Sequence, residues 1–532
     1  MPDVAVNRSP LQARLFTSSL LGYHQRFSAL IDYGGALLSS LLLILAFPSF
    51  ELWSLAWFAL SPLLIVCIAN RRRWRPFFLG WLFGTVFFYG SCYWLTYSMI
   101  HTAGLPRWIA YLLLVPGAVL LGLFPALFGL FISRLAGKFG SRMLMLAPFA
   151  WIGLEWLRLE ITGQLWNAIG YSQAFHPAWI SAANWGGVYA VGFFIVLVNA
   201  ALAFALIEHN ARALIVLIAS VVVSAFGLAY APPGPLDSIA NSGETVEVVA
   251  IQPNVPMDLS KSNEELKNLM TRHLEMSEGA LSQLTDGLHP VLLVWPESPM
   301  NFAYGSDAQL RATLAEFAQK HRVSILLNSQ EAAPNDGIYN SAVLVNEEGK
   351  LVVQYDKIRL LPFGEYVPLP DWVPGSGLIR AIVGDFTAGT NYQLMPVGNL
   401  RAGVFICIES AYPSIARRFS QAGANVLINI SNDGYLGPTA VMRQHLSNAV
   451  FRAVENGRPL LSVTNTGISA YITPRGEVRE ATAGFIPATR IWTIDTQANR
   501  ATFYLRHGDL FVICCTIFSL LAVVFSFVRI KE

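Results

Sequence analysis

Long apolar runs, broken by short polar loops, fill the first 230 residues of the chain. A helix that spans a membrane needs about 20 predominantly apolar residues. Runs of this kind predict seven spans, near residues 29–48, 52–69, 77–99, 108–132, 143–157, 181–207 and 213–231. An eighth run without charge, Leu510–Val528, lies close to the carboxyl end. The pattern therefore predicts a membrane α-helical bundle of about eight spans.

After the seventh run the pattern changes to short β-branched stretches that alternate with helical ones. Apolar strands separated by helices indicate an α/β layered domain with buried strands. The predicted strands are Val246–Ile251, Val291–Trp295, Val323–Asn328, Gly403–Ile406, Val426–Ile430 and Leu460–Thr464. The predicted helices are 262–284, 307–320 and 441–456. The run Pro232-Pro233-Gly234-Pro235 is expected to end the seventh span and to act as a short, stiff linker.

These patterns divide the chain into four parts. Residues 1–28 are expected to form an amino-terminal tail and residues 29–231 a seven-helix transmembrane domain. Residues 232–505 are expected to form a globular domain, and residues 506–532 a last span with a short tail. Composition agrees with a membrane protein, because only 13% of the residues are charged, against roughly 25% in ordinary soluble domains. The net charge of +2 gives no reason to expect a nucleic-acid partner.

The lysines and arginines of the loops separate into two sets. The larger set has 13 members in the two tails and in alternate loops: Arg8, Arg14, Arg26, Arg71, Arg72, Arg73, Arg75, Arg134, Lys138, Arg142, Arg212, Arg529 and Lys531. The short loops on the opposite side carry only Arg107 and Arg158. By the positive-inside rule the larger set is cytoplasmic. Both tails are then cytoplasmic, and residues 232–505 lie outside the membrane.

Reactive side chains follow three of the strand-like segments. In open α/β sheets, functional groups collect beyond the carboxyl ends of strands. Glu297 follows VLLVW, Lys357 follows LVVQYD, and Cys407 follows GVFI. Each residue alone also has a purely structural explanation, as a packed core cysteine or as a solvated charge at a strand end.

Cys407 is the candidate nucleophile. Of the five cysteines, Cys67, Cys92, Cys514 and Cys515 lie in apolar runs, and only Cys407 lies in polar sequence. The segment SAYPSIARRF after it is expected to begin a helix, and a helix amino terminus or a nearby ammonium lowers the pKa of a thiol. Glu297 could accept the thiol proton, and Lys357 could stabilise the thiolate and an oxyanion. No CxxC or CxxH spacing occurs, so no cysteine-based zinc site is expected.

The flanking sequences resemble a known family. WPES, YDKIRLLPFGEYVP and FICIES, in that order, resemble the Glu-Lys-Cys set of the nitrilase (carbon–nitrogen hydrolase) superfamily. The blocks AIQPNVP, SNDGYLG and RAVENGRPLLSVTNTGISA, with several spans before the domain and one after it, resemble the apolipoprotein N-acyltransferases. The resemblance implies a nitrilase-like α-β-β-α sandwich in which Glu297, Lys357 and Cys407 are catalytic. It also implies that Glu365 supports the lysine and the base, and that Glu409 is the acidic residue two places after the nucleophile.

The chain departs from the family pattern in three places. Ile408 stands where an aromatic residue is common, and Ser462 stands where an arginine is usual. MDLSKSNEEL replaces a stretch that often contains a tryptophan. These departures concern lid contacts and acyl-chain preference more than the reaction.

The resemblance implies an acyltransferase of the bacterial inner membrane with its catalytic domain in the periplasm. A phospholipid would donate an acyl chain through a thioester on Cys407 to the free α-amine of the amino-terminal S-diacylglyceryl-cysteine of an apolipoprotein. It implies a monomer that uses no cofactor and no metal. One alternative is a membrane-tethered amidase, for which a single anchor would suffice. Another is a receptor or scaffold with an inactive fold, which would be expected to have lost one of the three residues.

Three further polar residues are candidates with weaker support. Glu155 and Arg158 lie at the outer end of the fifth predicted span, before TGQLWNAIGYSQ. They form either a structural ion pair or a contact for a lipid headgroup, because charges near a membrane are default functional candidates. His445 is explained as a surface histidine and is given no role.

Overall fold

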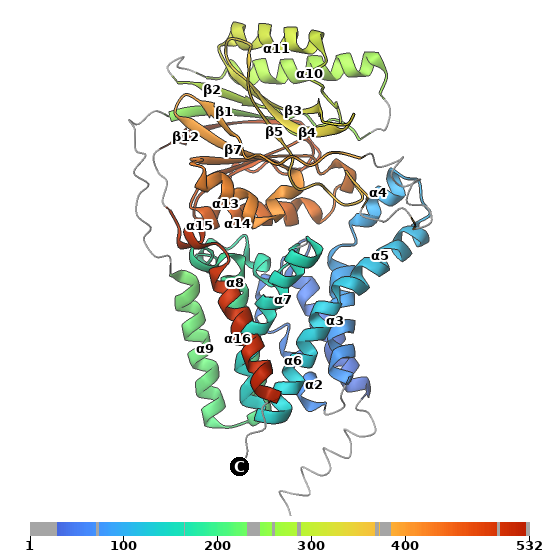
Figure 1. Cartoon of the computed structure of the whole chain (residues 1–532), viewed down its shortest axis with the longest axis vertical. Coiled ribbons are helices and arrows are strands. Elements are labelled where there is room, and N and C mark those ends of the chain that lie inside the picture. The colour runs from blue at the N-terminus through green and yellow to red at the C-terminus, as the bar shows by residue number, and fades with distance from the viewer. Residues whose placement is uncertain are drawn as a thin grey trace, which may run out of the picture.

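The computed structural model describes residues 29–70, 74–163, 165–230, 245–257, 261–284, 289–367, 372, 385–496 and 501–527. A helical part and an α/β part are stacked along the long axis of the molecule (Figure 1). The predictions for the tail 1–28, the arginines 71–73, the linker 232–235 and the charges at 529 and 531 lie outside the described residues.

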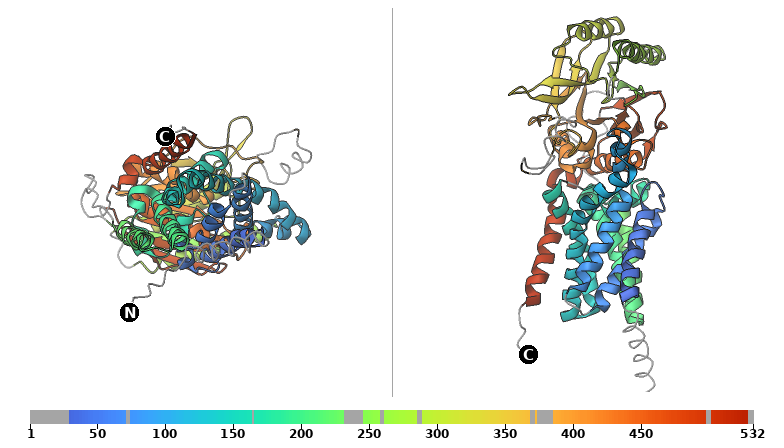
Figure 2. Two further views of the ribbon diagram at one scale, coloured as in Figure 1. Left: turned by 90° about the horizontal axis from the view of Figure 1, so that it is seen from below. Right: turned by 90° about the vertical axis from the view of Figure 1, so that its right-hand side faces the viewer.

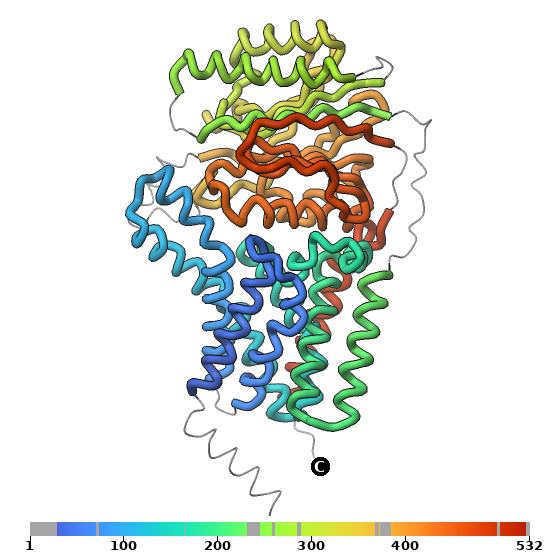
Figure 3. The backbone as a smooth tube through the Cα atoms, turned by 180° about the vertical axis from the view of Figure 1, so that it is seen from behind, coloured from blue at the N-terminus to red at the C-terminus, as the bar shows by residue number. Residues whose placement is uncertain are grey.

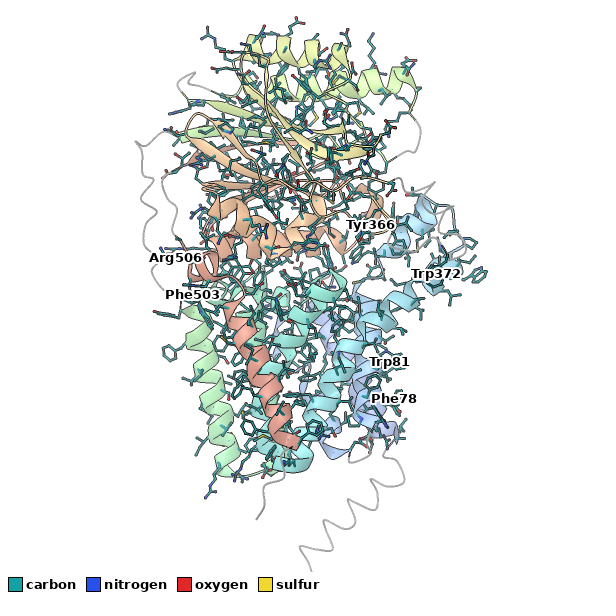
Figure 4. All side chains as sticks on the ribbon, in the orientation of Figure 1. Phe78, Trp81, Tyr366, Trp372, Phe503 and Arg506 are labelled. Carbon is teal, nitrogen blue, oxygen red and sulfur yellow. The ribbon has the colours of Figure 1, made fainter. Side chains whose placement is uncertain are left out.

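Helices occupy every position at which a span was predicted. In chain order they are Ala29–Ala46, η1 (Trp53–Trp57), α2 (Ser61–Ala69), α3 (Arg75–Ser91), α4 (Leu95–His101), α5 (Arg107–Leu121), α6 (Leu123–Phe139), η2 (Ser141–Leu146), α7 (Ala147–Thr162), η3 (Ile169–Gln173), η4 (Pro177–Trp179), α8 (Ala183–Glu208), α9 (Ala211–Ala229), α15 (Phe503–His507) and α16 (Leu510–Phe527). Aromatic side chains such as Phe78 and Trp81 extend from α3 at the edge of the helical part (Figure 4).

Fewer of these helices than predicted are long and apolar enough to cross a membrane alone. Among the described residues five qualify: Ala29–Ala46, Arg107–Phe139, Ala183–Glu208, Ala211–Ala229 and Leu510–Phe527. A sixth span results if α3 and α4, which are bent by 52° at their junction, are taken together. The segment Trp53–Ala69 is shorter, and α7 has only 16 residues. The chain is thus a multi-pass membrane protein with five to six spans by length and composition, and the count of eight stays a prediction.

The predicted charge cluster of Arg134 and Lys138 lies at the end of the helical part that is farther from the α/β part (Figure 1). Arg134 Nε donates to Ser526 Oγ at 3.0 Å. Lys138 Nζ donates to the carbonyl oxygens of Phe525 and Ser526 at 3.2 and 3.0 Å. The end of α6 therefore contacts the end of α16, which points away from the α/β part (Figures 1 and 2). The predicted orientation requires this contact, because it places the loop after α6 and the carboxyl-terminal tail on the same side of the membrane.

Two six-stranded sheets form the α/β part. The first sheet has the order β12-β1-β2-β3-β4-β5 and the second the order β11-β10-β9-β8-β7-β6. Strands β1, β2 and β3 are parallel, as are β7, β8 and β9, and the outer strands are antiparallel. The strands are β1 (Thr245–Gln252), β2 (Val291–Val294), β3 (Ser324–Ala332), β4 (Ile338–Val345), β5 (Leu351–Asp356), β6 (Leu394–Val397), β7 (Leu400–Ile406), β8 (Val426–Ser431), β9 (Leu460–Thr464), β10 (Ala470–Ile472), β11 (Val478–Arg479) and β12 (Ala488–Asp495).

Helices cover both outer faces of the paired sheets. α10 (Asn263–Leu281) and α11 (Ala308–His321) cover the first sheet, and α13 (Pro413–Gln421) and α14 (Val441–Asn456) cover the second (Figures 1 and 3). Alternate residues of a strand face opposite sides, so Val248 joins the core between the sheets and Val249 packs with the α10–α11 layer. The predicted α-β-β-α sandwich, its six predicted strands and its three predicted helices are confirmed.

The inner helix layer joins the sandwich to the helical part. α14 and α15 both contact α8, and one hydrophobic core runs from the membrane helices into the second sheet. Phe503 and Arg506 of α15 mark the level of this junction (Figure 4). The sheet that carries Cys407 at the end of β7 is consequently the one nearer the helical part (Figure 1).

Candidate active site

The three reactive residues predicted from strand ends meet between the two sheets. Glu297 follows β2 and Lys357 follows β5 in the first sheet, while Cys407 follows β7 in the second. The Cys407 thiol donates a hydrogen bond to the Glu297 carboxylate. Lys357 Nζ lies 3.8 Å from Glu297 Oε1. A thiol, a carboxylate and an ammonium are therefore within reach of one another.

Cys407 occupies a constrained turn. The buried strand β7 ends at Ile406, and the 3₁₀ turn η5 (Cys407–Ala411) begins with Cys407 at a φ of +51°. A residue other than glycine seldom adopts this left-handed conformation, which costs about 1–3 kcal/mol and clusters at functional sites. The turn leaves the side chain partly exposed. The predicted helix after it is α13, confirmed at Pro413–Gln421.

The thiol of Cys407 is protonated at rest. Burial raises the pKa of the Cys407 thiol well above its ordinary value, and the Glu297 carboxylate raises it further. The Lys357 ammonium opposes both effects without reversing them. The Lys357 ammonium lowers this pKa as expected, but the net direction is upward, because a partly enclosed thiol beside a carboxylate loses more stabilisation as a thiolate than the ammonium returns. The thiol thus needs a base.

Glu297 is placed to be that base. Its side chain is 16% exposed, and Oε1 accepts a hydrogen bond from Asn340 Nδ2 at 3.0 Å. Burial raises the pKa of Glu297 above its ordinary value, and the nearby Lys357 ammonium partly offsets this rise. A carboxylate with a raised pKa accepts a proton more readily near neutral pH.

Lys357 is buried and held by Glu365. Nζ of Lys357 lies 2.8 Å from Oε1 of Glu365, and the lysine side chain is 1% exposed. Burial lowers the pKa of Lys357, but the Glu365 and Glu297 carboxylates outweigh burial and raise the pKa above its ordinary value. Glu365 Oε2 in turn accepts from the backbone N–H of Leu361 at 2.7 Å. The lysine is therefore a fixed positive charge.

Asn340 on β4 links the two carboxylates, and sequence reasoning missed it. Its Nδ2 donates to Glu297 Oε1 at 3.0 Å and to Glu365 Oε1 at 2.6 Å. Its Oδ1 accepts from Asn328 Nδ2 at 2.7 Å. A signal was available, because two asparagines interrupt apolar strands, and buried polar side chains need partners.

Glu409 lies beneath the site and holds its backbone. This fully buried carboxylate accepts from Tyr355 Oη at 2.9 Å and from the N–H groups of Ile358 and Arg359 at 2.8 and 3.0 Å. It also accepts from the N–H of Ile406 at 2.8 Å. Glu409 thereby ties the segment after Lys357 to the turn of Cys407.

His445 is not a surface histidine. Its Nε2 lies 3.0 Å from the carbonyl oxygen of Cys407, and its Nδ1 lies 2.9 Å from Asp433 Oδ1. The side chain is 7% exposed. The structure therefore corrects the sequence-based explanation and brings a histidine–aspartate pair to the backbone of the nucleophile.

Glu155 and Arg158 lie in the helical part, where they order a loop. Glu155 Oε1 accepts from Trp151 Nε1 at 2.9 Å and from the N–H of Ile169 at 2.8 Å. Arg158 donates to the carbonyl oxygen of Trp166 at 2.9 Å. Both line a mainly apolar pocket between the helices, together with Phe88 and Trp151. Their described contacts are with α7 itself, with the loop after it and with Phe88 of α3, and not with the Glu297–Lys357–Cys407 cluster.

Two of the departures from the family pattern are buried in the domain core. Ile408 packs in the hydrophobic core that runs through the second sheet. Ser462 on β9 donates from Oγ to the carbonyl oxygen of Ile468 at 3.2 Å. Neither side chain removes a group from the cluster of thiol, carboxylate and ammonium.

An α-β-β-α sandwich with this cluster at its strand ends defines a carbon–nitrogen hydrolase domain. Residues 248–502 match the family model described as carbon-nitrogen hydrolase. Residues 39–201 match the model described as apolipoprotein N-acyltransferase N-terminal domain. Among solved structures, the chain aligns with Saccharomyces cerevisiae Nit3, a member of the nitrilase superfamily, at 20% identity and a TM-score of 0.37, over 48% of this chain and 92% of that one.

Full-length relatives identify the family within this class. An apolipoprotein N-acyltransferase from Geobacter metallireducens is 31% identical over 501 residues, which cover 91% of this chain and 93% of the relative. One from Rhizobium meliloti is 30% identical over 509 residues, which cover 90% and 94%. The chain belongs to the apolipoprotein N-acyltransferase family.

Proposed function

We propose that Cys407 carries the acyl group as a thioester between a membrane phospholipid and an apolipoprotein. The activity follows from family membership, since the relatives that match nearly the whole chain are apolipoprotein N-acyltransferases. The observation that supports the assignment to Cys407 is its hydrogen bond to Glu297, whose Oε1 lies 3.8 Å from the Lys357 ammonium. Covalent catalysis of this kind divides one difficult acyl transfer into two easier steps.

In the first half-reaction, Sγ of Cys407 attacks the carbonyl carbon of a phospholipid ester while Glu297 takes the thiol proton. The oxyanion of the tetrahedral intermediate is stabilised by the Lys357 ammonium. The bond between the carbonyl carbon and the glycerol oxygen then breaks. Glu297 returns its proton to that oxygen, so a lysophospholipid leaves and the acyl group remains on Cys407.

In the second half-reaction, the free α-amine of the S-diacylglyceryl-cysteine attacks the thioester carbonyl. Glu297 accepts a proton from the amine, and Lys357 again faces the oxyanion. The carbon–sulfur bond breaks and Cys407 regains its proton from Glu297. The products are an amide on the apolipoprotein and the free enzyme, with no net change in the site.

The alternative of an amidase for a soluble substrate is disfavoured by the architecture. Both substrates of the acyl transfer are lipids, and five to six apolar helices accompany the catalytic domain. Cys407 belongs to the sheet nearer these helices (Figure 1). A site for a soluble amide gains nothing from such a position.

The membrane arrangement is also part of the proposal. Residues 29–231 and 506–532 form the membrane domain, and residues 232–505 form the catalytic domain in the periplasm of a bacterium, outside its inner membrane. The support is the thirteen-to-two division of loop charges. The enzyme acts as a monomer, because one chain supplies Glu297, Lys357 and Cys407.

The test is to incubate the purified enzyme with a phospholipid that carries labelled acyl chains, without an acceptor. The label is expected to stay on the protein and to be released by hydroxylamine, which cleaves thioesters. Cys407→Ser should abolish labelling, while Cys67→Ser and Cys514→Ser should retain it. Labelling that survives Cys407→Ser would show that the nucleophile is another residue.

A further inference from the structure

Three consecutive polar residues lie near the start of α14, the helix between the second sheet and the helical part. They are Arg443, Gln444 and His445. Successive residues of an α-helix point about 100° apart, since the helix has 3.6 residues per turn. These side chains therefore reach three different parts of the molecule.

His445 reaches the nucleophile turn. Its Nδ1 lies 2.9 Å from Asp433 Oδ1 and 3.4 Å from Ser431 Oγ, and its Nε2 lies 3.0 Å from the Cys407 carbonyl oxygen. A carboxylate and a carbonyl oxygen both accept hydrogen bonds, so both ring nitrogens must carry protons. The ring is thus an imidazolium. Asn429 Nδ2 donates to the same Cys407 oxygen at 3.2 Å.

The surroundings of His445 favour this charge. Burial lowers the pKa of His445, but the Asp433 carboxylate and the Cys407 carbonyl outweigh burial and raise the pKa above its ordinary value. The Glu297 carboxylate acts in the same direction. From the helical part, the ring of Trp166 lies 6.0 Å away, centroid to centroid. A fixed cation therefore lies beside the backbone of the reactive cysteine.

Gln444 reaches the helical part, where both the oxygen and the nitrogen of its side-chain amide form hydrogen bonds. Its Oε1 accepts from Trp94 Nε1 at 2.9 Å and from Trp166 Nε1 at 2.7 Å. Its Nε2 donates to the carbonyl oxygens of Pro48 and Ser91, each at 3.0 Å. A primary amide has two donors and two acceptor sites, and all four are satisfied. The partners come from three separate segments of the membrane domain.

Arg443 adds a contact on the same side. Its guanidinium forms a two-pronged ion pair with Glu51, and the second prong measures 2.8 Å between Nη2 and Oε2. The guanidinium carbon lies 3.7 Å from the centre of the Phe175 ring. The first turn of α14 is therefore fixed to the membrane domain by Arg443 and Gln444, the two residues that directly precede His445.

We propose that Gln444 and His445 are positioning residues for the acyl transfer: Gln444 fixes α14 on the membrane-domain loops, and His445, oriented by Asp433, holds the backbone of Cys407 from the same turn. This inference rests on the proposed role of Cys407 as the nucleophile. A thiol that attacks a membrane lipid must lie at a set distance from the helices that border that lipid. Adjacent residues on one rigid helical turn provide such a link.

The first test measures acylation of His445 variants by vesicles of phosphatidylethanolamine and phosphatidylglycerol with labelled acyl chains. His445→Leu is expected to lower the rate of thioester formation roughly 100-fold, the size of effect that a misplaced reacting group produces. His445→Gln should recover part of this loss, because its amide can still donate to the Cys407 carbonyl. His321→Gln on the outer helix α11 is the control and should keep the wild-type rate.

A second readout separates positioning from general stability. Alkylation of Cys407 by iodoacetamide is measured by mass spectrometry as a function of pH. The pH profile of alkylation should shift to higher pH in both His445→Leu and His445→Gln, because a cation near the thiolate is lost. A wild-type rate in folded His445→Leu, or an unchanged alkylation profile in both variants, would overturn the role of His445. Labelling of Cys407→Ser would instead overturn the nucleophile assignment, so the two failures are distinguishable.

The role of Gln444 is tested with Gln444→Glu, which keeps the shape of the side chain. A carboxylate oxygen would then face the carbonyl oxygens of Pro48 and Ser91, and thioester formation at saturating lipid is expected to fall at least tenfold. The control is Gln319→Glu on α11. It removes a similar hydrogen bond, which the Gln319 Nε2 donates to the Glu348 carbonyl oxygen at 2.8 Å, and it should have no effect on thioester formation. A folded Gln444→Glu variant with the wild-type rate would show that this docking does not position the nucleophile.

Discussion

The Lys357 ammonium is paired more closely with Glu365 than with the proposed base. Nζ lies 2.8 Å from Glu365 Oε1 and 3.8 Å from Glu297 Oε1. Glu365 is therefore the nearer counter-charge of the lysine. Burial is the main cause of the raised pKa of Glu297, and the Glu365 charge raises that pKa further.

Glu365→Gln is expected to change the pH dependence of thioester formation. The Glu365 charge raises the pKa of Glu297, so its removal lowers that pKa. Because the rate requires ionised Glu297 and is lost as pH falls through its pKa, the acidic limb should move to lower pH. The plateau rate should fall about tenfold or more, since a hydrogen bond to a charged group is worth about 1.5–3 kcal/mol. An acidic limb that stays in place or moves upward would contradict this coupling.

Glu297→Gln should block formation of the thioester itself. A glutamine cannot accept the thiol proton, and the pKa of Cys407 lies well above its ordinary value, mainly through burial. A loss of roughly 100- to 10,000-fold is expected, the usual contribution of a general base. The measurement is acyl-enzyme formed from phospholipid alone, with circular dichroism as the folding control. A variant that forms the thioester normally and stalls only at the amine step would restrict Glu297 to the second half-reaction.

Glu409→Gln should reduce both stability and rate. The carboxylate accepts from Tyr355 Oη and from three backbone N–H groups, and a glutamine would place an N–H against one of these donors. The expected cost is about 1–3 kcal/mol of unfolding free energy, seen as a lower Tm in detergent. Thioester formation should fall with it, because Glu409 joins the lysine segment to the Cys407 turn.

A second buried glutamate serves as the control for Glu409. Glu331 accepts from the Gly305 N–H at 3.1 Å and from Ser329 Oγ at 2.6 Å. Glu331→Gln should lower the Tm without lowering the rate of thioester formation. Equal rates for the two variants at matched stability would mean that Glu409 has only a structural role.

The proposed orientation predicts opposite results for two reporter fusions. A reporter that is active only in the periplasm should be active when fused after Ala231 and silent when fused after Arg75. The reason is the thirteen-to-two distribution of loop lysines and arginines. The reverse result would place residues 232–505 in the cytoplasm.

Much of the fold was predictable because local pattern determines it. Helical and strand patterns differ in period, so the sequence predicted the helical part and six of the twelve described strands, and all six of these are present. The number of spans could be predicted less well. A break near residues 92–94 bends α3 against α4 by 52°, and α7 is 16 residues long. Hydropathy alone does not distinguish such segments from full spans, because their depth depends on packing against neighbouring helices.

The positions of the reactive groups could be predicted from local pattern, since Glu297, Lys357 and Cys407 each follow an apolar strand. The polar residues that surround them could not, because long-range packing brings these residues together. Asn340 lies 43 residues from Glu297 in the chain, and His445 lies 38 from Cys407. Their roles depend on strand register and on how α14 packs. The asparagines that interrupt apolar strands indicate that Asn340 needs polar partners, but they do not indicate which ones. The direction of the Cys407 pKa was decided in the same way, because burial in the folded site outweighs the ammonium that the sequence places near it.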